Sequence, residues 1–183
     1  MTTDGLYRQT PDGTRSPMLL GALVARGKSA GIYAIESDGS GDEDGRVAKI
    51  YLTPAIAAEN ADKLEAMLPT APDLPAVEKD GALFPLIAWP DALIVDAGGT
   101  VCGYTMPRID EAVMLPLIAL IDPQSPTNAD GAEAPADFVL HGYVAYNLAH
   151  DMAEMHRCGH RFNRLDWNKI RFHPQLATLA VLA

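Results

Sequence analysis

Apolar and polar residues alternate along several short segments of the chain, and this period of two is typical of β-strands that bury one face. Glycine, aspartate and serine residues separate the segments, so neighbouring strands are expected to pair as antiparallel hairpins. Residues 1–17 are polar and contain two prolines, which indicates a flexible arm. The strands predicted after that arm are 18–24, 31–36, 46–52, 92–96 and 101–106.

One helix is predicted directly after the third strand. Thr53 offers a hydroxyl N-cap and Pro54 fits the first helical position, so the helix begins there and continues to about residue 68. A second helix is predicted from about residue 137 to Gly159, because glycine commonly follows the last turn. Two short strands, 170–172 and 176–182, are expected after it.

The second helix is amphipathic. Its apolar stripe contains Val144, Leu148, Met152 and Met155. The opposite side contains Asn147, His150, Glu154 and Arg157. We interpret His156 as a buried structural histidine. The apolar stripe is expected to be covered by a protein partner or by a second copy of the chain.

A loop between the first two strands is the main candidate for ligand binding. The segment from Ala25 to Tyr33 contains Gly27, Lys28 and Ser29, and Lys49 follows on the third strand. Such a hairpin can cover the phosphates of a nucleotide while the lysine pairs with them. Residues 22–29 also lack only one glycine of a P-loop, but a P-loop needs a helix after Lys-Ser. A hairpin without any ligand remains a third interpretation.

Composition narrows the classes of partner. The 183 residues are 48% hydrophobic and 21% charged, as in an ordinary globular protein. The net charge is −10, which argues against nucleic acid as a partner, since clustered cations dominate that affinity. No apolar segment reaches membrane-spanning length and no signal peptide is evident, so we expect a cytoplasmic protein without a membrane partner. Cys102 and Cys158 are too isolated to indicate a zinc site or a disulfide framework.

Four segments of the sequence, taken together, resemble the sequence pattern of a known family. They are Ala48-Lys49-Ile50-Tyr51, Trp89-Pro90, Gly103-Tyr-Thr-Met106-Pro-Arg108 and His156-Arg-Cys-Gly159. In this order they resemble the bacterial protein-kinase-like domains of helix-hairpin-helix kinase proteins and of tellurite-resistance-linked operons. The resemblance covers roughly residues 19–172.

The resemblance implies an α+β fold: a five-stranded antiparallel small lobe with one helix, plus the first helix and hairpin of a large lobe. The implied division is an arm at 1–17, a small lobe at 18–109, a linker at 110–136 and a partial large lobe at 137–183. The large lobe is expected to be truncated, because the resemblance stops before the metal-binding aspartate of a kinase.

The resemblance also implies roles for individual residues. Lys49 would pair with the phosphates of ATP, and a helix glutamate, either Glu59 or Glu65, would hold the lysine in place. We prefer Glu59, whose alternative role is as an exposed partner of Lys63. The segment at Met106 and Arg108 would correspond to the hinge whose backbone meets the adenine.

The catalytic positions of the resembled family are altered here. Where the family has an aspartate and an asparagine, this chain has Arg164 and Lys169, which can neither accept a proton nor bind Mg²⁺. Shifting the alignment would make Asp166 the base and Asn168 the metal ligand, but their spacing is too short for the expected geometry. We therefore expect no metal site and no dependence on Mg²⁺.

The function expected from these observations is that of a pseudokinase-type module, which binds a nucleotide weakly or regulates a partner without catalysis. Two alternatives remain open. The first is a minimal or partner-completed phosphotransferase that uses Lys49, Glu59 and Asp166. The second is a structural interaction module whose nucleotide pocket is empty.

Overall fold

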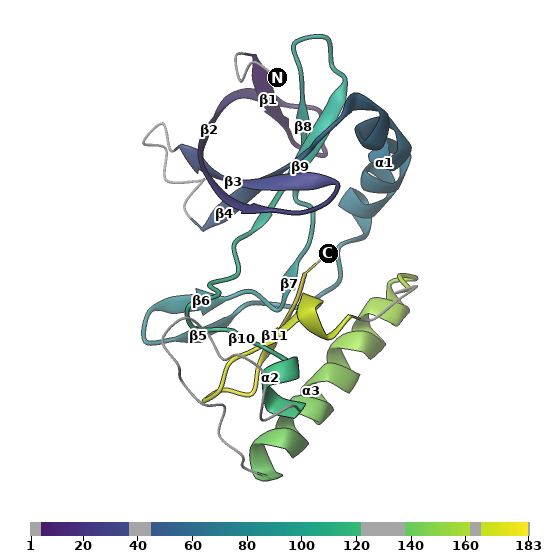
Figure 1. Ribbon diagram of the computed structural model, residues 1–183. Helices are drawn as coiled ribbons and strands as arrows, with labels where there is room; N and C mark the ends of the chain where they lie inside the picture. Colours follow the sequence, from purple (N-terminus) through teal and green to yellow (C-terminus); the bar gives the residue numbers. More distant parts are fainter. Residues whose placement is uncertain (1–4, 37–44, 122–137, 162–165, 183) are drawn as a thin grey trace. The chain divides into compact units, whose positions relative to one another are not determined.

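Six antiparallel strands close into a barrel in the first of two units of the chain (Figure 1). The computed structural model describes residues 5–36, 45–121, 138–161 and 166–182. The first unit contains residues 1–71 and 89–108, and the second contains residues 72–88 and 109–183. The barrel strands, in the order in which they pair, are β1 (Leu6–Gln9), β2 (Arg15–Arg26), β3 (Ala30–Glu36), β4 (Arg46–Tyr51), β9 (Val101–Pro107) and β8 (Ala92–Val95).

Strand β1 closes the barrel by pairing with both neighbouring edges. Tyr7 lies opposite Pro17 of β2 on one side and opposite Val95 of β8 on the other. A tight turn leads from β1 to β2, in which the amide of Thr10 donates to the carbonyl of Thr14 at 3.0 Å. Closure removes the two sheet edges that an open five-stranded sheet would expose.

This closure shows that the expected fold class was wrong. We expected a kinase-like α+β small lobe with an open sheet of five strands, and the described chain is instead mostly β, with a closed six-stranded barrel, smaller sheets and three α-helices. The error began at residues 1–17, whose prolines and glycines suggested an arm. Within that segment residues 6–9 are a strand, because pairing on both sides satisfies their backbone groups.

The barrel has its own hydrophobic core. Strand alternation sends Ala48 and Ile50 of β4 to the inside, where they meet Met18 and Ile94. Cys102 also packs there, next to a register shift between β8 and β9. The opposite, outer face of β4 presents Lys49, and that orientation positions the candidate site.

Helix α1 (Pro54–Met67) packs against the barrel. The Thr53 hydroxyl accepts a hydrogen bond from the amide of Ile56 at 3.3 Å, which confirms the predicted N-cap. Ala57 and Leu64 are buried on its inner side. A short 3-10 turn, η1 (Leu68–Thr70), follows α1 directly, so the helical segment extends to Thr70.

The second unit is built on a four-stranded sheet with the order β10, β11, β12, β7. Its strands are β10 (Leu115–Pro116), β11 (Ile170–Phe172), β12 (Leu179–Leu182) and β7 (Ile87–Ala88). Only the β12–β7 pair is parallel. The other elements are the hairpin β5 (Val77–Lys79) and β6 (Ala82–Phe84), the helices α2 (Ile118–Ile121) and α3 (Phe138–Arg157), and the 3-10 turn η2 (Trp167–Lys169). Residues 122–136 of the linker expected at 110–136 lie outside the described residues.

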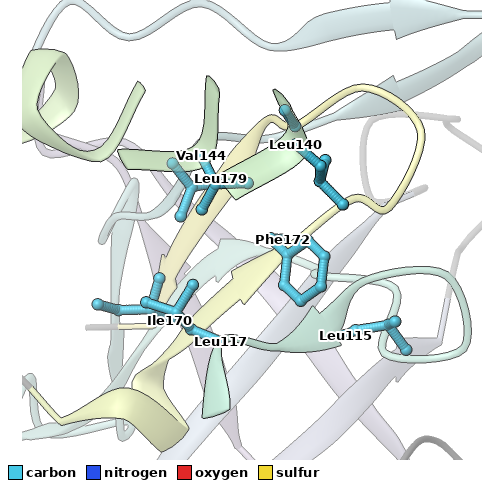
Figure 2. Close-up of a cluster of buried hydrophobic side chains, with 8 residues drawn as sticks. Leu115, Leu117, Leu140, Val144, Ile170, Phe172 and Leu179 are labelled. Carbon is cyan, nitrogen blue, oxygen red and sulfur yellow. The ribbon is translucent and has the colours of Figure 1, made fainter. Parts of the chain in front are cut away.

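Helix α3 packs one face against this sheet. Figure 2 shows Leu140 and Val144 of α3 together with Phe172 and Leu179 of the sheet strands. Val144 and Met155 of the expected stripe are therefore buried within the chain itself and need no partner to cover them, while association with a partner stays a prediction. Leu148 packs against the same cluster and is only partly exposed.

Two polar residues of α3 occupy unexpected positions. His156 is exposed, so its interpretation as a buried histidine was wrong. Asp151 is 4% exposed, although a carboxylate rarely occupies a buried face. Helical spacing explains both positions, because Asp151 is seven residues after Val144 and four before Met155, whereas His156 is only one residue after Met155.

The contact between β4 and β9 depends on Gly103. Gly103 lies opposite Ile50, and a Cβ atom built on it would overlap the carbonyl oxygen of Lys49. The two backbones therefore approach more closely than any side chain at this position would allow.

We expect Gly103→Ala to destabilise the barrel by about 2 kcal/mol or more, because β4 and β9 must separate to admit the methyl group. Urea unfolding measures this free energy. Gly142→Ala in α3 is the control, since its added Cβ meets no atom within 4 Å and should be neutral or stabilising. Equal stability of the Gly103→Ala protein and the wild type would contradict this account.

Candidate functional site

Lys49 lies on the outer face of the barrel, in a row of otherwise apolar side chains. The strand registers place it between Ile32 of β3 and Tyr104 of β9. Ala25 of β2 and Leu93 of β8 extend the same row on either side. We call these five residues the Lys49 row. Lys49 is the single charged residue of the row and is only partly exposed.

Tyr104 orients the lysine. The Lys49 ammonium donates a hydrogen bond to the Tyr104 hydroxyl at 2.8 Å, and its nitrogen lies 5.2 Å from the centre of the same ring. Burial lowers the pKa of Lys49, because a charged amine loses hydration there. The barrel therefore holds a cation at a position that weakens its hydration.

A second tyrosine stands beside the first. The rings of Tyr51 and Tyr104 are 6.4 Å apart and tilted by 59°. Burial, together with the neighbouring Tyr104, raises the pKa of Tyr51 to about 12. Burial raises the pKa of Tyr104 as well. Both phenols are therefore protonated at neutral pH, and their oxygens can accept hydrogen bonds from the ammonium without neutralising it.

The glycine loop is a tight turn between β2 and β3. Gly27, Lys28 and Ser29 are all exposed, and the amide of Gly27 donates to the carbonyl of Ala30 at 2.8 Å. Strand β3 begins at Ala30, so no helix follows Lys28 and Ser29. This continuation excludes the P-loop interpretation, because a P-loop uses the N-terminus of a following helix to bind the anion.

The glutamates of α1 do not lie on its buried face. Glu59 and Glu65 are both exposed, while Ala57 and Leu64 are buried. Asn60 is half-buried, and its side-chain amide donates to the carbonyl of Ile56 at 2.8 Å. Neither glutamate therefore shares the buried side of the helix.

The expected hinge residues have structural roles within the barrel. Met106 is 5% exposed and lies opposite Val47. Arg108 is exposed, and its amide donates to the carbonyl of Gly45 at 2.8 Å. That amide is thus already engaged by the segment before β4.

The candidate catalytic residue belongs to the other unit. Asp166 is half-buried, and its carbonyl accepts a hydrogen bond from the amide of Lys169 at 2.8 Å as η2 begins. Lys169 is exposed. Arg164 and the side chain of Asn168 lie outside the described residues. Lys49 and Asp166 therefore belong to different units of the chain.

A partly buried polar network at Asp91 was not anticipated from the sequence. Asp91 accepts hydrogen bonds from Arg46 at 2.6 Å and from the fully buried hydroxyl of Thr105. The amide of Asp91 also donates to the carbonyl of Thr105 at 3.0 Å. These contacts join the start of β8 to β4 and β9, and the pairing of residues 45 positions apart explains why no local motif revealed them.

His173 is a second buried polar residue that the sequence did not single out. It is 4% exposed, and its Nδ1 accepts hydrogen bonds from the amides of Gln175 and Leu176 at 3.1 and 3.2 Å. The ring of Phe84 meets it edge-on at 4.9 Å. Because Nδ1 is an acceptor, the ring is neutral with its proton on Nε2. Burial and the nearby Lys79 lower the pKa of His173.

No family model and no curated protein matches the chain. The resemblance to kinase-like domains therefore stays a prediction from the sequence. Among the described residues, no helix is both long and apolar enough to cross a membrane. The same residues contain no group of three or more His, Cys, Asp or Glu side chains that could hold a metal ion.

The hydrogen bond between Lys49 and Tyr104 can be measured by a double-mutant cycle. We expect Lys49→Met and Tyr104→Phe each to destabilise the barrel by about 1–3 kcal/mol, because each removes one group of a hydrogen bond between partly buried side chains. The double variant should lie within about 1 kcal/mol of the wild type, since it removes both polar groups. Urea unfolding of the four proteins gives the coupling, and strictly additive losses would contradict the bond.

The neutral state of His173 predicts a dependence of stability on pH. Its pKa is lower in the folded than in the unfolded chain, so below about pH 6.5 the unfolded chain binds more protons. Stability is therefore expected to fall as the pH decreases through and below that value. Urea unfolding at several pH values tests this, with His173→Asn as the control, because an amide oxygen can accept the same hydrogen bonds without titrating. A wild type and variant with identical pH profiles would contradict the prediction.

Proposed function

We propose that the barrel unit is a non-catalytic module that binds a nucleotide such as ATP through Lys49. The observation that carries the proposal is the Lys49 ammonium, partly buried in an apolar row and hydrogen-bonded to Tyr104. A bound phosphate group would stabilise the charged form of Lys49 and so offset the hydration that the ammonium loses by burial. An ion pair in such surroundings is also screened less than one in open solvent.

The neighbours of Lys49 favour a nucleotide over a bare phosphate. Ile32 is half-buried and Ala25 is exposed in the same row. Apolar and small side chains of this kind can receive the flat face of a base, while the lysine binds the phosphates. Nucleotide binding of this kind uses only residues of the barrel strands and does not require a kinase fold.

The chemistry of the second unit supports a role without catalysis. Lys169 occupies the position where the sequence resemblance expects a metal-binding asparagine, and its exposed ammonium has no lone pair for Mg²⁺. Phosphoryl transfer depends on positioned charges and metal ions. The two free thiols, Cys102 and Cys158, agree with a cytoplasmic location, where disulfides are rare.

We expect ATP to bind weakly and almost equally with and without Mg²⁺. Isothermal titration of the purified chain measures both affinities. The double variant Lys49→Met/Tyr104→Phe should lose at least about 10-fold in affinity, since removing one charge-assisted contact costs roughly 1.5–3 kcal/mol. Lys28→Met is the matched control, because it removes an exposed lysine at the neighbouring turn.

Three results would contradict the proposal. The first is an affinity for ATP that is the same in the wild type and the Lys49 variant. The second is a strong dependence of binding on Mg²⁺. The third is turnover of labelled ATP that disappears in Asp166→Ala, which would favour the phosphotransferase alternative instead.

A further inference from the structure

Helix α3 has a second face that is apolar and open to solvent. Val139, Tyr143 and Tyr146 are 57%, 60% and 69% exposed. These residues share one side of the helix with three exposed small residues. We call the six the open α3 face: Val139, Gly142, Tyr143, Tyr146, Ala149 and Ala153.

The open α3 face is unusual because the outer side of an amphipathic helix is normally polar. None of its six residues is charged, but the same side of α3 also carries the exposed His150 and ends at the Glu154–Arg157 ion pair. Beyond the helix backbone, a Cβ atom built on Gly142 would meet no atom within 4 Å, so none of the described residues covers the surface there. Contiguous exposed apolar side chains of this kind mark an interaction site.

The sizes of the side chains indicate what kind of partner fits. The first half of the open α3 face has the large residues Val139, Tyr143 and Tyr146, and the second half has the small residues Ala149 and Ala153. We propose that a second copy of the chain docks here, with the two α3 helices antiparallel and a two-fold axis near Tyr146.

In this arrangement the large side chains away from the axis meet small ones, and the two Tyr146 rings meet each other at the axis. An axis at Tyr146 places Tyr143 opposite Ala149 of the second copy, and Val139 opposite Ala153. Gly142 then meets the exposed His150, which leaves room for the imidazole ring. Since a two-fold interface uses the same patch on both copies, the patch must complement itself, and this sequence of sizes does so. A parallel pair would instead place Tyr143 against Tyr143.

The exposed area is sufficient for a dimer of moderate affinity. An aromatic side chain can bury about 150–250 Å². Phe138, which is 90% exposed at the start of α3, borders the face and adds to it. The whole surface offers on the order of 600 Å² per copy, or about 1,200 Å² per pair, which is the lower end of the range for specific interfaces.

Sedimentation velocity over a wide range of concentration tests the dimer. We expect a reversible monomer–dimer equilibrium in the wild type. Tyr146→Glu should raise the dissociation constant by about 100-fold or more, because two like charges would meet at the axis. Leu83→Glu is the control, since Leu83 is 67% exposed on β6, outside the open α3 face, and should leave the equilibrium unchanged.

A cross-linking experiment tests the position of the axis. In a Cys158→Ser background, the Tyr146→Cys variant should form an intermolecular disulfide under mild oxidation, which joins residue 146 of one copy to residue 146 of the other. Ala153→Cys should not, but it should cross-link when mixed with Val139→Cys. A wild type that stays monomeric would overturn the proposal, and so would a dimer that persists in Tyr146→Glu. Self-cross-linking at residue 153 instead of residue 146 would rule out the antiparallel arrangement.

Discussion

The pairing of β4 with β9 is the contact on which both the barrel and the candidate site depend. Gly103 allows the two backbones to meet at a distance that no side chain would permit. The resulting register places Lys49 opposite Tyr104, and it leaves Ile50 on the inner face with the barrel core. A shift of one residue would reverse these positions, so that the lysine would enter the core and the apolar residue would leave it.

Partial burial of the Lys49 ammonium costs free energy of hydration, and this cost is the reason to connect Lys49 with function. A barrel of this kind could be completed with an apolar residue at the same position, as the rest of the Lys49 row shows. The hydrogen bond to Tyr104 offsets part of the lost hydration but leaves the cation partly exposed. Titratable groups perturbed by burial are found disproportionately at binding sites, although ion-pair networks can perturb them too.

The two faces of helix α3 have different roles. Its inner face completes the core of the second unit around Phe172 and Leu179. Its outer face presents the large exposed apolar side chains Val139, Tyr143 and Tyr146, and charge is confined to the last turns, where Glu154 and Arg157 form an ion pair. Nucleotide binding through the barrel and self-association through α3 use residues of different units, so neither proposal depends on the other.

The sequence by itself determined the local features of this protein. The N-cap at Thr53, the placement of Lys49 on the strand face opposite Ala48 and Ile50, and the turn at Gly27 all follow from contacts within a few residues or from strand alternation. The tertiary structure alone decided that β1 closes the barrel, because that strand needs partners from two distant segments. It also decided that Tyr104 meets Lys49 and that His173 and Asp151 are buried, since hydrogen bonding and burial of these residues depend on packing between elements far apart in the chain.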